Sequence, residues 1–245
     1  MTHFALIVGS GFPLLGFEVL TRSPTKTAYG EPSSAVLTLA IRGARVPCIV
    51  RHGEEHHLAP HEINYRANLK ALEQRGVRAC VAINTVGAID ASLLPGELAV
   101  PDQLIDYTHG RVSTYGGAGA PVRHLEFDEP FSPELRGRIA AAASDCGFSV
   151  RTGTYGVTQG PRLETAAEIG RLARDGCAMV GMTAMPEAAL ARELGIDYAI
   201  CAVAVNWAAG RSPDGTPILR QIEQRMDAGL RKVRAVLERL VGGAV

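Results

Sequence analysis

The sequence has no excess of charge of either sign. Its 25 lysine and arginine residues balance 25 aspartate and glutamate residues, so the formal net charge at pH 7 is zero. Proteins that bind nucleic acid or an anionic membrane surface usually carry a basic field that attracts phosphate groups. The composition therefore argues against a nucleic-acid partner and against binding to a membrane surface.

Long hydrophobic runs are also missing. The apolar stretch at residues 4–8 has no basic cluster before it, and Gly9, Gly11 and Pro13 interrupt the chain directly after it. A secretory signal has a basic start and a longer apolar core, and a membrane-spanning helix needs about 20 apolar residues. We therefore expect a soluble protein of the cytoplasm.

Cysteine is scarce, and the spacing of the cysteines argues against a zinc site, a redox site and disulfides. The cysteines are odd in number, widely spaced and free of the C-x-x-C pairs that favour a zinc or redox site. We expect reduced thiols that pack as small buried side chains. They are Cys48, Cys80, Cys146, Cys177 and Cys201.

A convincing set of metal ligands is missing as well. His52, His56 and His57 are close in the sequence, but no carboxylate or cysteine completes a plausible coordination geometry around them. The G-x-S-x-G motif that carries the nucleophilic serine of many hydrolases is also absent from the sequence. Neither a metalloenzyme nor a serine hydrolase is expected.

Short apolar runs typical of strands alternate with longer helical patterns, which predicts an α/β fold. No linker or repeat divides the chain, so we expect one domain over residues 1–245. Ser132 is a candidate N-cap, because Pro133 and Glu134 follow it at the start of a helical pattern. Strands are expected at residues 4–9, 35–41, 46–51, 77–84, 97–106, 150–155, 178–182 and 196–205. Helices are expected at residues 61–75, 133–146, 163–174, 186–194 and 218–240, and a flexible glycine-rich loop at 113–120.

Six of the expected strands run into small or polar residues, and ligands of α/β sheets gather at such carboxyl ends. Each stretch taken alone also fits a plain turn or a helix cap. An arginine and a histidine can bind phosphate or lie on the surface, and Glu164 would sit in the first turn of a helix, where the dipole favours it. The stretches are residues 8–11, 51–53, 83–88, 158–165, 180–187 and 206–210.

Taken together and in this order, the six stretches resemble the trimeric purine nucleoside phosphorylase and methylthioadenosine phosphorylase family. Residues 61–68 and 95–106 also match, so the resemblance spans nearly the whole chain. It implies a single domain with a central mixed, partly barrel-like β-sheet flanked by helices. It further implies a homotrimer that acts on a purine nucleoside, with phosphate as co-substrate and no cofactor or metal.

The resemblance also implies a role for particular residues. Phosphate would be bound by Ser10, Arg51, His52 and Thr183, with Asn84 or Thr85 lining the same pocket. Met182 and Leu163 would contact the nucleoside, His56 would approach the 5′ side of the sugar, and His124 would reach the site of a neighbouring subunit. The chain departs from many relatives at Ser10, where they have threonine, and at Asn84, where they have threonine or serine.

The choice of base depends on two predicted catalytic residues, Glu164 and Asn206. Relatives selective for 6-aminopurines have aspartates where this chain has Asn206 and Ala208, whereas relatives selective for 6-oxopurines pair an asparagine with a glutamate. A 6-oxopurine has a donor at N1, which Glu164 can accept, and acceptors at O6 and N7, which the Asn206 amide can serve. Adenine would leave one buried polar group unpaired, at a cost of about 1–3 kcal/mol.

The 5′ side separates two classes of 6-oxopurine nucleoside. Relatives that act on inosine have a histidine in the late segment that binds the 5′-hydroxyl, but residues 206–245 contain none. Ile218, Leu219 and Ile222 would instead form an apolar wall suited to a methylthio group. The resemblance therefore favours phosphorolysis of 5′-methylthioinosine. The alternatives are an inosine- or guanosine-type phosphorylase, a side activity on methylthioadenosine, a nucleosidase that uses water, and a non-catalytic binding protein.

Overall fold

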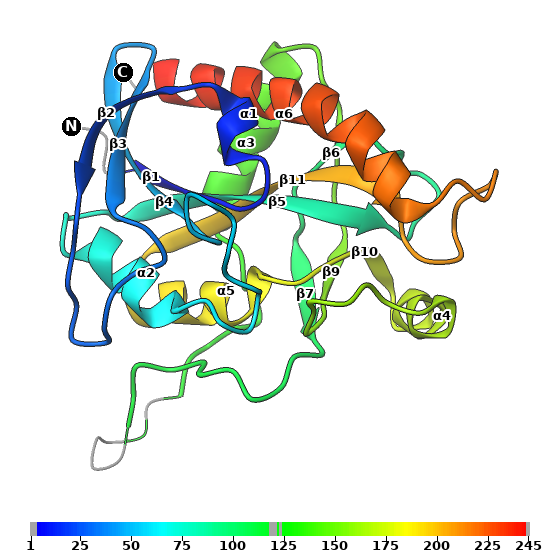
Figure 1. Ribbon diagram of the computed structural model, residues 1–245, viewed down its shortest axis with the longest axis horizontal. Helices are drawn as coiled ribbons and strands as arrows, with labels where there is room; N and C mark the ends of the chain where they lie inside the picture. The colour runs from blue at the N-terminus through cyan, green and yellow to red at the C-terminus, as the bar shows by residue number, and fades with distance from the viewer. Residues whose placement is uncertain (1–3, 118–121, 123, 244–245) are drawn as a thin grey trace.

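One mixed β-sheet runs through the protein in the computed structural model, which describes residues 4–117, 122 and 124–243 (Figure 1). Within these residues the strand order is β2-β3-β4-β1-β5-β10-β9-β7, and β11, β6 and β8 form a branch from β5. The strands are β1 Phe4–Val8, β2 Glu18–Ser23, β3 Val36–Ile41, β4 Ala44–Val50, β5 Ala79–Ala88, β6 Leu98–Ala99, β7 Gln103–Asp106, β8 Val150–Arg151, β9 Thr154–Val157, β10 Cys177–Gly181 and β11 Asp197–Trp207.

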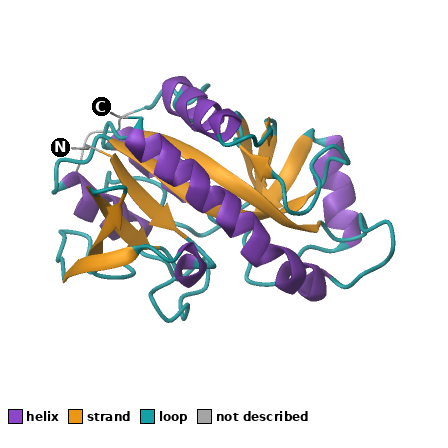
Figure 2. Ribbon diagram, turned by 90° about the horizontal axis from the view of Figure 1, so that it is seen from above, coloured by secondary structure: helices purple, strands orange, loops and turns teal. Residues whose placement is uncertain are grey.

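Helices cover both faces of this sheet. The long helix α6 packs on β11, α3 and α1, and Figure 2 shows it lying across the strands. On the other face α2 packs against α5, while α4 lies beside β10 at one end of the molecule (Figure 1). No helix of the described residues is long and apolar enough to cross a membrane. The helices are α1 Phe12–Leu15, α2 Tyr65–Glu73, α3 Pro133–Asp145, α4 Ala166–Arg174, α5 Ala184–Glu193 and α6 Ile218–Gly242.

The centre of the sheet is parallel and buried on both faces. β1 pairs in parallel with β4 and β5, and β5 pairs in parallel with β11. Along β1, Leu6 and Val8 join the core beneath α6, whereas Ala5 and Ile7 join the core beneath α2 and α5. A strand covered on both faces needs a continuous apolar run, which explains why its residues do not alternate with polar ones.

The sheet branches at β5, which makes it mixed. Gly87 and Ala88 at the end of β5 pair with β10 in the antiparallel sense, while the other edge of β5 stays paired with β11. The β11 pairing is irregular between Ala204 and Asn206. This large mixed sheet flanked by helices is the predicted fold class. Its branching brings the ends of β1, β4, β5, β10 and β11 together around one space.

Two elements were not predicted, and two predicted strands are divided. β2 is an edge strand with mostly exposed polar residues, and α1 is a single short turn after β1, so neither has a strong apolar pattern. The strand expected at 97–106 is two strands, β6 and β7, with Pro101 between them. Proline cannot donate a ladder hydrogen bond, and a strand ends readily at it. The strand expected at 150–155 is two strands, β8 and β9. Of the predicted flexible loop, residues 118–120 lie outside the described residues.

The start of α4 corrects the expectation for Glu164. The helix begins at Ala166, and Thr165 caps it in a reciprocal capping box with Glu168. Glu164 therefore precedes the helix and does not lie in its first turn, so stabilisation by the helix dipole does not explain it. Ser132 does cap α3, as predicted, by accepting a hydrogen bond from the backbone of Leu135.

The cysteines are all free thiols. Four of them are buried, and Cys146 is half-buried. Burial raises the pKa of Cys201 to about 12, which keeps it a neutral thiol and a poor nucleophile. The structure thus agrees with the expectation of reduced thiols that pack in the interior.

Candidate active site

A cavity of about 470 Å³ opens where the central strands end. Ser10 follows β1, Arg51 follows β4, Asn84 lies in β5, Met182 follows β10, and Asn206 lies near the end of β11; all five line this cavity. Its volume is in the range of small-molecule sites. The cavity therefore forms where polar residues follow the strands, as the sequence predicted.

Most of the predicted site residues line this one cavity. The polar ones are Ser10, Arg51, His52, His56, Asn84, Thr85, Glu164, Thr183 and Asn206, and the apolar ones are Leu163, Met182, Ile218 and Ile222. They come from segments spread between positions 10 and 222 of the chain. Glu164 and Asn206, on which the predicted choice of base depends, thus share a cavity with the residues expected to bind phosphate.

Two predicted residues lie outside the cavity. Leu219 is 67% exposed, because one helical step of about 100° from Ile218 turns it towards solvent. Within this chain it does not form part of the apolar wall, which corrects that expectation. His124 is exposed in the segment before α3 and does not line the cavity either. Its role at a neighbouring subunit stays a prediction.

Arg51 is held by a buried ion pair that the sequence did not predict. Its Nε and Nη2 donate to the two carboxylate oxygens of Glu187, at 2.8 and 2.7 Å, and both side chains are almost inaccessible to solvent. Burial alone would lower the pKa of Arg51, but Glu187 outweighs this effect and raises the pKa above its usual value. The guanidinium therefore stays charged, and its charge is balanced within the protein.

Asn84 connects Arg51 to the next polar residue of the cavity. Its Oδ1 accepts from Nη2 of Arg51 at 3.2 Å, and its Nδ2 donates to the Thr183 hydroxyl at 3.1 Å and to the Tyr155 hydroxyl at 3.3 Å. The amide is thus fully engaged inside the protein. Because the Thr183 oxygen accepts this bond, the Thr183 hydroxyl hydrogen stays free to donate to a ligand.

Histidines form a second part of the same wall. His52 Nδ1 lies 2.8 Å from the carbonyl oxygen of Leu58, which can only accept, so this nitrogen carries the hydrogen. Burial lowers the pKa of His52 from 6.5 to about 4, so its ring is neutral at pH 7 and Nε2 is an acceptor. His56 Nε2 lies 2.8 Å from the Ser10 hydroxyl oxygen. His56 therefore contacts Ser10, which is predicted to bind phosphate. Its expected approach to the sugar stays a prediction.

Glu164 and Asn206 are positioned by short local contacts. The Thr158 hydroxyl donates to Oε1 of Glu164 at 2.5 Å, which fixes a carboxylate on a segment outside any helix or strand. Asn206 Nδ2 donates to the carbonyl oxygen of its neighbour Trp207 at 2.7 Å. Oε2 of the glutamate and the second amide hydrogen of the asparagine have no such partner among these contacts, so both side chains retain hydrogen-bonding capacity for a ligand.

The remaining wall is apolar and belongs to α6. Ile218, Ile222 and Met226 line the cavity at intervals of four residues, so they form one stripe of the helix. Gln221 ties this helix to β11, because its Oε1 accepts from the Trp207 amide at 2.8 Å and its Nε2 donates to the Thr216 carbonyl at 2.6 Å. The stripe is thereby fixed next to Asn206.

Sequence reasoning missed several residues that build the site. Glu187 lies in one of the six marked stretches, but nothing local showed that it would pair with Arg51. Met226 could have been found from the i, i+4 spacing that continues from Ile218 and Ile222. Tyr155 and Tyr198 had no sequence signal; the Tyr198 hydroxyl donates to Glu187 at 2.7 Å.

Among the described residues, no three histidine, cysteine, aspartate or glutamate side chains gather in a way that could hold a metal ion. The cavity is lined by hydroxyl, amide and imidazole groups together with the Arg51 guanidinium, whose charge Glu187 balances. The hydroxyl groups and the remaining N–H of Arg51 can donate hydrogen bonds to an oxyanion, whereas the engaged Asn84 amide and the neutral His52 ring cannot. Glu164 and Asn206 beside them can bind the edge of a heterocyclic base.

Comparison with known proteins gives consistent results. The chain matches the Phosphorylase superfamily over residues 3–242. It is 54% identical over 209 residues to a probable S-methyl-5′-thioinosine phosphorylase of Xylella fastidiosa, with 84% of each chain covered. It is 41% identical over 220 residues to a 6-oxopurine nucleoside phosphorylase of Pyrococcus furiosus, which covers 86% of this chain and 82% of the other. Among solved structures, methylthioadenosine phosphorylase from Schistosoma mansoni in complex with adenine has a TM-score of 0.91 at 28% identity, covering 98% of this chain and 90% of that one.

Proposed function

Because the chain belongs to the phosphorylase superfamily, we propose that it cleaves S-methyl-5′-thioinosine with phosphate, giving hypoxanthine and 5-methylthioribose 1-phosphate. The observation that carries this proposal is the shared cavity. Glu164 and Asn206, 42 positions apart in the sequence, line the same space as the hydroxyl groups of Ser10 and Thr183. The similarity to thioinosine and 6-oxopurine phosphorylases supports the same substrate class.

The two polar side chains at the base suit a 6-oxopurine. The Glu164 carboxylate accepts a hydrogen bond from N1–H, and the Asn206 amide donates to O6 or N7. In the free site Asn206 donates to the Trp207 carbonyl at 2.7 Å, so its second amide hydrogen serves the base. Adenine has an acceptor at N1, which would face the carboxylate without a hydrogen between them.

Phosphate binds mainly to neutral donors. Four of the five Arg51 N–H groups are engaged, two with Glu187, one with Asn84 and one with the Ile83 carbonyl, which leaves one for a ligand. The hydroxyls of Ser10, Thr85 and Thr183 supply the other donors from this wall. Since Glu187 neutralises Arg51, the bound phosphate keeps its negative charge and can stabilise a cationic sugar.

In the reaction, a phosphate oxygen attacks C1′ of the ribose while the bond between C1′ and N9 breaks. The bonding electron pair stays on the purine, whose negative charge is stabilised by the Asn206 amide at O6 or N7, and solvent then protonates the released base. The side chains position both reactants and stabilise charge, and none of them forms a covalent bond. Phosphate is the co-substrate, and the proposal includes no cofactor or metal.

The apolar stripe of Ile218, Ile222 and Met226 supports a methylthio group at the 5′ position. A hydroxyl buried against these side chains would lose its hydrogen bonds to water without replacement, whereas a thioether would not. We also propose that the protein is a cytoplasmic homotrimer in which His124 reaches the site of a neighbouring subunit. The trimer is supported by the exposure of His124 outside the cavity of its own chain. The cytoplasm is supported by the free thiols.

A substrate panel tests the proposed function. Methylthioinosine, methylthioadenosine, inosine, guanosine and adenosine are each incubated with the enzyme, with and without phosphate, and base release is followed. We expect turnover that depends on phosphate and is fastest with methylthioinosine. Equal turnover without phosphate would indicate a nucleosidase, and fastest turnover of inosine would move the assignment to a general 6-oxopurine phosphorylase.

A further inference from the structure

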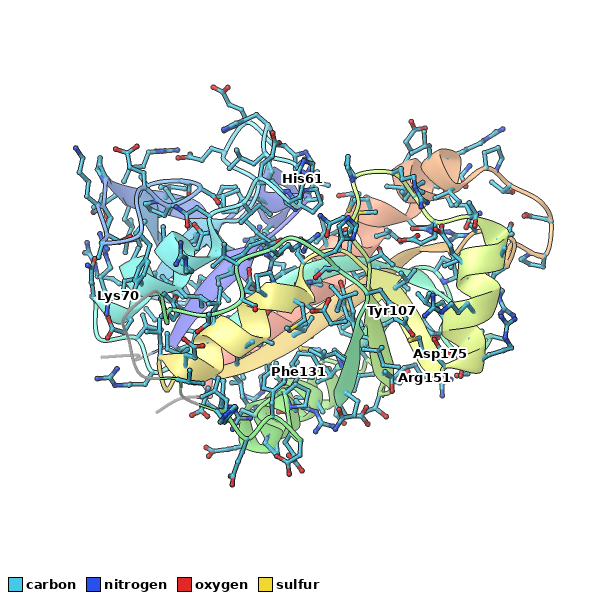
Figure 3. All side chains as sticks on the ribbon, turned by 90° about the horizontal axis from the view of Figure 1, so that it is seen from below. His61, Lys70, Tyr107, Phe131, Arg151 and Asp175 are labelled. Carbon is cyan, nitrogen blue, oxygen red and sulfur yellow. The ribbon has the colours of Figure 1, made fainter. Side chains whose placement is uncertain are left out.

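Arg111 lies where three neighbouring parallel strands end. β7 pairs in parallel with β9, and β9 pairs in parallel with β10, so their carboxyl ends meet at one edge of the sheet. Arg111 follows β7 by five residues. The loops after β9 and β10 carry Glu164 and Met182, so Arg111 stands between two loops that supply opposite parts of the candidate site. Figure 3 labels Tyr107 at the start of the Arg111 loop, near Asp175, to which its hydroxyl donates.

One side of the guanidinium binds the loop after β10. Nη1 of Arg111 donates to the carbonyl oxygens of Met182 and Met185, each at 2.7 Å. Met182 lines the cavity next to Thr183, and Met185 lies at the beginning of α5, two residues before Glu187. These contacts fix the backbone that carries the proposed ribose and phosphate contacts.

The other side of the guanidinium binds the loop after β9. Nη2 of Arg111 donates to the Gln159 carbonyl at 2.7 Å and to the Thr158 carbonyl at 3.4 Å, and Nε donates to Oε1 of Gln159 at 3.2 Å. Thr158 also donates its hydroxyl to Glu164. Arg111 thus holds the backbone on which the Glu164 carboxylate depends.

The two loops also touch beside Arg111. Gly160 has a φ of +62°, and a Cβ built on it would meet Sδ of Met182 at 2.5 Å. A side chain at this position would be strained by the positive φ and would displace the Met182 side chain.

Arg111 is not one half of an ion pair. Within the part of the chain that the structure describes, no carboxylate forms a salt bridge with it, although it is partly buried and desolvation lowers its pKa. Its shortest hydrogen bonds go to carbonyl oxygens from two separate loops, and Nη1 also donates to the Tyr65 hydroxyl at 3.4 Å. A planar guanidinium presents five donors in a fixed fork, and a lysine ammonium cannot span the same set.

Building on the function proposed above, we infer that Arg111 is a positioning residue that fixes the Glu164 loop relative to Met182 and Thr183, and so sets the selectivity for 6-oxopurines. The Arg111 loop is itself anchored, because Tyr115 donates its hydroxyl to the Arg66 carbonyl and its amide to Glu193. Loss of the guanidinium removes its contacts to both loops, while the Arg51–Glu187 pair keeps its own two hydrogen bonds.

The test compares Arg111→Gln and Arg111→Lys with the wild type. A displacement of about 1 Å in a reacting group can cost about 100-fold in rate, so kcat/KM for methylthioinosine should fall by about that factor in Arg111→Gln. The ratio of kcat/KM for methylthioinosine to that for methylthioadenosine should fall about 10-fold, because the carboxylate no longer holds its place against N1. For Arg111→Lys, both kcat/KM and this ratio should lie between the values of the wild type and of Arg111→Gln. The matched control is Arg239→Gln, an exposed arginine near the end of α6 that pairs with Asp145 and does not line the cavity, which should leave the ratio unchanged.

Selectivity separates positioning from general damage. A variant that is merely less folded loses activity on all substrates by the same factor, so an unchanged ratio in the folded fraction of either variant overturns the inference. A fallen ratio in Arg111→Lys supports it even if Arg111→Gln does not fold. Failure of the wild type to release any base with phosphate would instead overturn the proposed function, which the same assay shows separately.

Discussion

Two parts of the cavity are built in different ways. The Arg51–Glu187 network consists of Arg51, Asn84, Tyr155, Thr183, Glu187 and Tyr198. It is buried and cross-linked between strands and α5. The two residues proposed to bind the base, named here the base-recognition pair, are Glu164 and Asn206. Each of these side chains is held by one contact to a nearby residue.

The two parts therefore differ in how much a substitution costs. The network satisfies its own charge and hydrogen bonds before a ligand arrives, so a change inside it exposes a buried charge or orphans a buried donor. Glu164 costs less to change, because its partner is local and its side chain is only half-buried, whereas Asn206 is as buried as Thr183. Similar proteins bear the names of thioinosine, 6-oxopurine and methylthioadenosine phosphorylases.

Removing the charge that balances Arg51 should have the largest effect. Glu187→Gln leaves a buried guanidinium without its carboxylate, and breaking such a pair costs about 3–5 kcal/mol in the free energy of unfolding. Urea denaturation would measure this loss. Glu238→Gln, which breaks an exposed pair with Arg234, is the control and should cost less than about 1 kcal/mol. A loss in Glu187→Gln no larger than the control's would show that the network is not a rigid, charge-balanced unit.

The pH dependence of stability should reveal the neutral His52. Between pH 6.5 and about 4 the unfolded chain binds a proton at this imidazole and the folded chain does not. The free energy of unfolding therefore falls by about 1.4 kcal/mol for each unit that the pH decreases through this window. Above pH 6.5 the imidazole is neutral in both states, so His52 adds nothing to the slope. His52→Gln should have a shallower slope in denaturation measured across these pH values.

The control for the pH experiment is His61→Gln, at an exposed position that Figure 3 labels. It should retain the wild-type slope. Equal slopes in wild type and His52→Gln would mean that His52 is not kept neutral by burial, and this wall of the cavity would then carry more positive charge than the network implies.

A change in the base-recognition pair should shift selectivity. Asn206→Asp replaces the amide donor by an acceptor, so O6 of a 6-oxopurine loses a partner while the 6-amino group of adenine gains one. The ratio of kcat/KM for methylthioinosine to that for methylthioadenosine should fall about 10- to 100-fold. An unchanged ratio would exclude Asn206 from the choice of base.

The smallest change tests the support of Glu164. Thr158→Val keeps the shape of the side chain but removes the hydroxyl that donates to Glu164, so kcat/KM for methylthioinosine should fall about 10-fold. Thr158→Ser restores the hydroxyl and should recover most of this loss in the same steady-state assay. If both variants behave like the wild type, the carboxylate is positioned by the rest of its loop.

Much of the site could be predicted from the chain because its parts are local. Polar residues directly after buried strands marked Ser10, Arg51 and Asn206, and the resemblance to a family assigned their expected roles. The helix start after Glu164 was placed too early, since the Thr165 capping box competes with an apolar pattern that extends further back. Leu219 was placed in the wall because the apolar composition of α6 does not reveal which side of the helix meets the cavity.

The sequence by itself determined the alternation of strands and helices, the polar strand ends and the identity of the two side chains expected at the base. Only the tertiary structure decided that Glu187 pairs with Arg51 across 136 positions of the chain, and that Arg111 joins the loops after β9 and β10. The physical reason is the distance along the chain over which each kind of interaction acts. Strands, caps and turns depend on neighbours within a few residues, whereas a buried charge is satisfied by whichever distant group the packed sheet brings within hydrogen-bonding distance.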